Sequence, residues 1–82
     1  MPLSFGEQLR LERKKQGLTT EKLAKSCGVS RSYITLIENG RRSPGKKILP
    51  KLAAALEVKT AIVLNWYLEE VSQKIREALD VA

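Results

Sequence analysis

The chain has 82 residues and a net charge of +6, from 15 Lys and Arg against 9 Asp and Glu, and 43% of its residues are hydrophobic. This length fits one small domain, and the hydrophobic share is ample for a packed core and too high for a disordered tail. One cysteine and no histidine exclude an internal disulfide and a zinc set, and no apolar run reaches the roughly 18 residues of a membrane helix.

The charge is unevenly distributed along the chain. Residues 1–59 carry thirteen basic and five acidic side chains, whereas residues 60–82 carry two basic and four acidic ones. This asymmetry favours a polyanionic partner for the first part and a different role for the second. The N-terminus has no signal-peptide pattern, which together with the single cysteine predicts a cytoplasmic protein, and no metal or cofactor is expected.

The chain is expected to form five helices and no strands, because no alternating β-branched run occurs. The predicted helices cover residues 5–16, 20–27, 31–39, 47–56 and 60–79. Ser4 and Glu7 form a capping box for the first helix, and Thr19 and Ser30 are N-caps of the second and third. Pro50 predicts that the fourth helix has an irregular first turn or begins late.

The second and third predicted helices form a helix-turn-helix. They are short and are joined by a tight turn at Gly28 and Val29. In each of the two helices the apolar residues fall on one side, which we expect to face the core. These residues are Leu23, Ala24, Cys27, Ile34 and Ile37. Cys27 is interpreted as a small core residue.

Four segments carry a resemblance to a known family. They are Leu18–Ala24, Cys27–Ile34, Ile37–Pro44 and Lys51–Val58. In this order and spacing they resemble the phage-repressor and Cro family of helix-turn-helix DNA-binding proteins, which is lambda-repressor-like and XRE-type. The resemblance covers about residues 5–64 and implies that residues 31–39 are the recognition helix, which lies in the major groove of DNA.

The resemblance implies a role for each polar position. The expected base-reading residues are Arg31, Ser32, Tyr33, Thr35 and Leu36. The expected DNA-backbone contacts are Thr19, Thr20, Ser30, Asn39, Arg41, Arg42 and Arg13. Independently, Arg31, Ser32 and Thr35 are polar and lie opposite Ile34 and Ile37 on the helix. Leu36 stands where relatives often place a polar reader, which favours contact with a thymine methyl group or no contact.

Several of these residues also have simpler interpretations. Tyr33 can be a packing residue with an exposed hydroxyl, and Arg41 and Arg42 can be solvated loop residues. Arg13 and Glu38 match a family pair that bridges the first and third helices, which implies that they orient the recognition helix.

The last predicted helix is longer than a four-helix core requires. We therefore divide the chain into a DNA-binding domain, residues 1–64, and a helical extension, residues 65–82. Apolar residues step along the extension at heptad-like spacing and predict self-pairing. The expected dimerisation residues are Leu64, Tyr67, Leu68, Val71, Ile75, Ala78 and Leu79, with Trp66 widening the stripe. The alternative is that the stripe folds back on the first and fourth helices.

Together these features predict a sequence-specific, double-stranded DNA-binding regulator of transcription, either a repressor or a controller. It would act as a homodimer on a pseudo-palindromic operator while associated with the nucleoid. The build is similar to controller proteins of restriction–modification systems. The alternative is a helix-turn-helix antitoxin whose last helix binds a toxin, and a polymerase subunit is a further candidate partner. An enzyme is not expected, because no histidine, phosphate-binding glycine loop or activated nucleophile is found.

Overall fold

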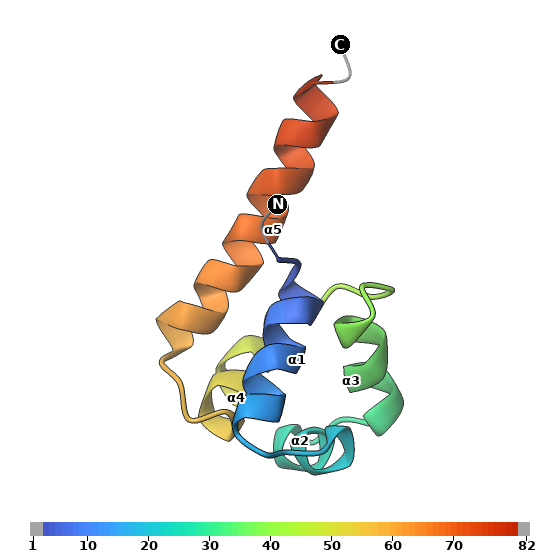
Figure 1. Ribbon diagram of the computed structural model, residues 1–82, viewed down its shortest axis with the longest axis vertical. Coiled ribbons are helices and arrows are strands. Elements are labelled where there is room, and N and C mark those ends of the chain that lie inside the picture. Colours follow the sequence, from blue (N-terminus) through green and yellow to red (C-terminus); the bar gives the residue numbers. More distant parts are fainter. Residues whose placement is uncertain (1–2, 81–82) are drawn as a thin grey trace.

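Five helices make up residues 3–80, the part of the chain that the structure describes. In this computed structural model they are α1 (Phe5–Lys15), α2 (Thr20–Cys27), α3 (Arg31–Glu38), α4 (Ile48–Ala55) and α5 (Thr60–Asp80). Figure 1 shows α1 to α4 gathered into a compact body, from which α5 extends. The predicted all-α, five-helix fold is confirmed, and each helix end lies within one residue of its predicted position. None of these helices is long and apolar enough to cross a membrane.

Side-chain caps fix the beginnings of the first three helices. The Ser4 hydroxyl accepts a hydrogen bond from the Glu7 N–H at 3.2 Å, and the Glu7 carboxylate accepts one from the Ser4 N–H at 3.1 Å. The hydrogen bond from the Ser4 N–H, and next to it the interaction with the Ser4 side chain, hold the pKa of Glu7 below its ordinary value. Thr19 and Ser30 cap α2 and α3 in the same manner, each accepting from the N–H three residues later at 3.1 Å. Local sequence therefore determines where these helices begin.

The start of α4 follows a different pattern. Lys47 precedes the helix without a side-chain cap. The Ile48 and Leu49 N–H groups bond to carbonyl oxygens three residues earlier, at 3.1 and 3.3 Å, so the entry is a tight, irregular turn. Pro50 stands in the first turn, where a helix has no need of the N–H that proline lacks. The expected irregular start is found.

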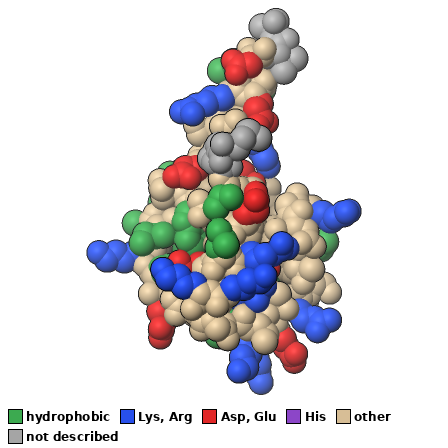
Figure 2. Space-filling view, in the orientation of Figure 1, with side chains coloured by type: hydrophobic (Ala, Val, Ile, Leu, Met, Phe, Trp, Pro, Cys, Tyr) green, Lys and Arg blue, Asp and Glu red, His purple; other side chains and the backbone are tan. Residues whose placement is uncertain are grey.

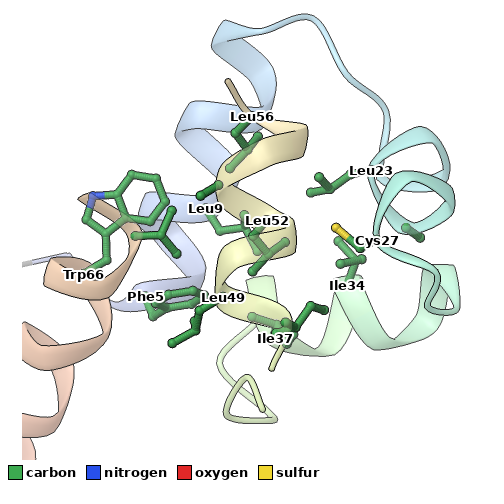
Figure 3. Close-up of a cluster of buried hydrophobic side chains, with 14 residues drawn as sticks. Phe5, Leu9, Leu23, Cys27, Ile34, Ile37, Leu49, Leu52, Leu56 and Trp66 are labelled. Carbon is green, nitrogen blue, oxygen red and sulfur yellow. The ribbon is translucent and has the colours of Figure 1, made fainter. Parts of the chain in front are cut away.

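One hydrophobic core holds the five helices together. Its fourteen buried members are Phe5, Leu9, Leu23, Ala24, Cys27, Ile34, Ile37, Ile48, Leu49, Leu52, Ala53, Leu56, Val63 and Trp66. Figure 3 shows these side chains pointing toward one another from all five helices, with the Cys27 sulfur on the α2 side. Burial raises the pKa of the Cys27 thiol, as expected for a structural core residue.

Trp66 does not belong to the exposed stripe that it was expected to widen. It is 9% exposed, and its ring meets Phe5 edge-on at 6.2 Å between centroids. Tyr67 is half-buried and meets the same ring at 6.4 Å. Trp66 therefore does not widen the exposed stripe, because it shares a side of α5 with buried Val63, three residues earlier. The core continues past residue 64 by about one helical turn.

The close approach of α1 to α3 depends on Gly6. A Cβ atom at this residue would stand 2.6 Å from the carbonyl oxygen of Glu38 and closer still to that of Ile37. These are backbone atoms, which cannot move aside without shifting α3. The absence of a side chain at Gly6 therefore permits the short distance between α1 and the C-terminal end of α3.

Beyond its first turn, α5 has an apolar side that the core does not cover. Leu64, Leu68, Val71, Ile75 and Leu79 are exposed, and Leu68 and Ile75 retain 53% and 56% of their accessible surface. The side that faces α1 at this level is polar and includes Glu70, Gln73 and Lys74. The apolar stripe therefore does not fold back on α1 and α4, contrary to the alternative that the sequence left open.

Candidate nucleic-acid interface

The turn between α2 and α3 sets the geometry of the candidate site. Gly28 ends α2 in the left-handed conformation, with φ of 69°, which glycine adopts without a steric penalty. The Val29 N–H then bonds to the Ala24 carbonyl at 3.0 Å, and Ser30 begins α3. Because the inner sides of both helices are buried in the core, the opposite side of α3 is held toward solvent.

The exposed side of α3 carries four of the five expected base-reading residues. Arg31, Ser32, Thr35 and Leu36 are exposed, and Ile34 and Ile37 on the other side are fully buried. Arg31 and Thr35 are four residues apart and therefore lie one above the other along the helix. The arrangement offers a guanidinium group, two hydroxyl groups and one apolar group on a rigid support, a combination that suits the edges of base pairs.

Tyr33 occupies a different position from the other four residues. It is half-buried against the core, and its hydroxyl accepts a hydrogen bond from the Gly45 N–H at 3.0 Å. The Arg42 guanidinium lies over its ring, 4.8 Å from the centroid. Tyr33 thus attaches the loop between α3 and α4 to α3 and holds Arg42 over its ring.

The expected DNA-backbone residues surround this side of the body. Thr19 and Ser30 stand at the N-terminal ends of α2 and α3, where helix dipoles favour phosphate, although both hydroxyl oxygens already accept capping bonds. Thr20 is half-buried at the first position of α2, and Arg41 and Arg42 are exposed in the loop after α3. Figure 2 shows Lys and Arg side chains projecting around the body, with both signs of charge along α5.

An ion pair links α1 to the end of α3. The Glu38 side chain is buried, with the residue 4% exposed, and Arg13 donates to both of its oxygens at 2.7 and 3.0 Å. A further N–H of Arg13 bonds to the Leu18 carbonyl at 2.8 Å. Donation of these hydrogen bonds to the Glu38 carboxylate raises the pKa of Arg13 above its ordinary value, against the effect of desolvation. Arg13 and Glu38 therefore form a charged link that holds α3 against α1.

Sequence reasoning missed two residues that shape this site, Gly6 and Arg10. Arg10 donates to Glu38 Oε1 at 3.4 Å and to Asn39 Oδ1 at 2.6 Å. The spacing in the sequence could have identified Arg10, because it stands one helical turn before Arg13 on the same side of α1. No local signal marks Gly6, because its contact lies in a distant segment.

The structure also places the expected dimerisation residues. Leu64, Leu68, Val71, Ile75, Ala78 and Leu79 are exposed along α5, whereas Tyr67 is half-buried against Phe5. At about 100° per residue, Leu64, Leu68, Val71 and Ile75 fall within a narrow arc of the helix surface.

Comparison with known proteins shows the family. The helix-turn-helix family matches residues 9–63, and the chain belongs to this family, of the phage-repressor and Cro type. It is 42% identical over 73 residues to the HTH-type transcriptional repressor RghR of Bacillus subtilis, covering 85% of this chain and 54% of the repressor. The chain thus spans about half the length of the curated relative.

Solved structures agree with this assignment. The restriction–modification controller protein C.AhdI from Aeromonas hydrophila is 37% identical with a TM-score of 0.69, over 72% of this chain and 89% of that protein. SinR, a master regulator for biofilm formation solved in complex with DNA, is 31% identical with a TM-score of 0.67, over 73% of this chain and 97% of the solved chain. None of these three proteins is described as an antitoxin, so that alternative gains no support.

Proposed function

We propose that this chain binds double-stranded DNA sequence-specifically through α3 and thereby regulates transcription. The observation that carries the proposal is the division of α3 into two sides. Ile34 and Ile37 are buried, whereas Arg31, Ser32 and Thr35 stand exposed on a helix whose orientation the Arg13–Glu38 pair fixes. The similarity to SinR, which was solved with DNA, supports the same conclusion.

The exposed residues divide into base readers and phosphate contacts. Arg31 is at the N-terminal end of α3, the part of a recognition helix that meets base edges, and it can donate to guanine O6 and N7. Ser32, Thr35 and Leu36 extend the reading surface, and Leu36 suits a thymine methyl group. Tyr33 acts mainly by holding the loop that carries Arg42.

The proposed contacts with the DNA backbone come from residues at the helix ends and in the loop near α3, and from α1. They are Thr19, Thr20, Ser30, Asn39, Arg41, Arg42 and Arg13. Arg41 and Arg42 provide charge, and the hydroxyl groups at the helix N-termini provide short hydrogen-bond donors. On this proposal the protein works in the cytoplasm, associated with the nucleoid.

The apolar stripe of α5 supports a homodimer. Five exposed apolar residues spaced by four, three, four and four positions form one stripe, and an exposed apolar stripe of this kind marks an interaction surface. Pairing of α5 with a second copy would cover them and place two α3 helices on one side of DNA. A two-fold dimer of this kind recognises a pseudo-palindrome with half-sites about 34 Å apart.

The proposed function is tested by selection from a random pool of duplex DNA at about 0.15 M salt, which suppresses nonspecific binding. We expect enrichment of an inverted repeat whose half-sites are about 10 base pairs apart. Binding without enrichment of any sequence would mean that α3 does not read bases, and the proposal would then be wrong.

The dimer is tested separately by sedimentation of the intact chain. We expect the wild-type protein to sediment as a dimer at micromolar concentration and L68E as a monomer, because the new carboxylate would be buried in the apolar interface. The matched control is I62E, which places the same charge on an exposed residue about 120° around α5 from Leu68. Loss of the dimer in both variants, or in neither, would contradict the assigned interface.

A further inference from the structure

Arg10 holds the side chain of Asn39 in one orientation. One terminal nitrogen of its guanidinium, Nη2, lies 2.6 Å from Oδ1 of Asn39, and its Nε lies 3.4 Å from Oε1 of Glu38. An arginine side chain has only donors, so the amide atom that faces it must be the oxygen. The Nδ2 group of Asn39 therefore points away from Arg10.

The outward Nδ2 group is available to a ligand. Asn39 is exposed at the C-terminal end of α3, and among residues 3–80 its Nδ2 group donates to no protein acceptor. Arg10, Asn39 and Arg41 line one open polar hollow at this end of the helix. The carboxylates of Glu7 and Glu38 also line this hollow, and Arg13 neutralises that of Glu38. The oriented Nδ2 group beside the Arg41 guanidinium is a donor arrangement that suits a phosphate oxygen.

Arg10 is not needed to neutralise Glu38. Arg13 already donates to both carboxylate oxygens of Glu38, at 2.7 and 3.0 Å. The contact of Arg10 with the same carboxylate is longer, and its side chain is 41% exposed. Its short, well-formed bond is the one to Asn39, which indicates that its principal contact is with the amide.

We propose that Arg10 is a positioning residue, which turns the Asn39 amide so that its Nδ2 group donates to a DNA phosphate. This inference rests on the proposed DNA-binding function. It explains why Arg10 reaches across from α1 to the end of α3. It also links the α1 surface to DNA affinity without any contact between Arg10 and a base.

A double-mutant cycle on the selected operator tests the proposal. We expect N39A to weaken binding about tenfold and R10A about threefold, both on every sequence alike. The double variant should bind no more weakly than N39A alone, because Arg10 acts only through Asn39. R10K should weaken binding in the wild-type background and have no effect beside N39A, since lysine keeps the charge and loses the planar group.

Two controls separate this role from simple charge. K15A removes one exposed cation from the same helix, on about the opposite side from Arg13, and should change affinity less than R10A. The slope of log affinity against log salt should be the same in R10A as in K15A. If Arg10 itself bound a phosphate, the slope would fall by about 0.9 and the losses in the cycle would add. Either result would overturn the proposal.

Measurements on the free protein exclude a general loss of structure. In the wild type, the two Nδ2 protons of Asn39 should give separate, dispersed nuclear magnetic resonance signals, which move toward free-amide values in R10A. Backbone signals of α3 away from Glu38 and Asn39 should not move. Widespread shifts of α3 would mean that Arg10 is structural and would overturn the proposal. A wild-type protein that selects no operator defeats the proposed function itself, whereas an additive cycle on a real operator defeats only the role of Arg10.

Discussion

α3 and α5 both have apolar residues at helical spacing, but the chain covers them differently. Ile34 and Ile37 of α3 are fully buried, and its solvent side is polar. In α5 the chain buries Val63 and Trp66 and leaves Leu68 and Ile75 more than half exposed. The difference teaches that helical periodicity alone does not say which apolar residues the chain itself covers, and it supports the proposal of different partners, base pairs for α3 and a second apolar helix for α5.

The largest expected effect comes from residues on the two sides of α5. W66A should lower the free energy of unfolding by about 3–5 kcal/mol, because it removes a large buried ring that packs on Phe5. L68A should change the unfolding of the monomer by less than about 0.5 kcal/mol and should instead weaken the dimer. Urea denaturation at several protein concentrations separates the two effects, since only dimer stability depends on concentration. Equal losses from both variants would remove the distinction between the two sides of α5.

The next effect concerns the support that holds α3. G6A should cost about 3 kcal/mol, because its methyl group meets the carbonyl oxygens of Ile37 and Glu38. For a domain of this size, that corresponds to a fall in Tm of more than about 10 °C. G45A is the matched control, since its Cβ meets only the Tyr33 hydroxyl at an ordinary 3.6 Å. Comparable melting temperatures for G6A and the wild type would contradict the close approach of α1 and α3.

A smaller effect is expected on the DNA-facing side of α3. R31A should cost about 1–3 kcal/mol of binding free energy on the selected operator and relax the preference at one base pair. K25A is the control, because it removes the same charge from an exposed position of α2. The measurement is a titration against the operator and its single-base variants. Uniform weakening on every sequence would assign Arg31 to a phosphate instead of a base.

Most of the fold could be predicted because its signals are local. Ser4, Thr19 and Ser30 cap helices by bonds within three residues, and Gly28 ends α2 in a conformation that few other residues adopt. Such signals act between neighbours in the sequence. The exposed side of α3 could also be predicted from the sequence, because side chains in a helix return to the same side every 3.6 residues.

The remaining features depend on contacts between distant segments. Periodicity placed Trp66 beside the stripe of α5, and only the position of Phe5 shows that its side belongs to the core. Arg10 and Asn39 are 29 residues apart, and their contact requires the approach of α1 and α3 that Gly6 permits. The Arg13–Glu38 pair was anticipated from the family resemblance, not from spacing. What the sequence could not provide is therefore the packing of α1 against α3 and α5.

The smallest expected effect lies at the turn from which α5 departs. Glu57 has φ of 56°, the one positive φ of a residue other than glycine within residues 3–80. A side chain in this left-handed conformation costs roughly 1 kcal/mol, so E57G should raise the free energy of unfolding by about 0.5–1 kcal/mol. G28A is the reverse experiment, because Gly28 has φ of 69° and open space around its Cβ position, and it should lower stability by a similar amount. Urea denaturation of both variants measures the same backbone preference in opposite directions. A loss of stability in E57G would show that the Glu57 side chain stabilises the turn by contacts that outweigh the strain.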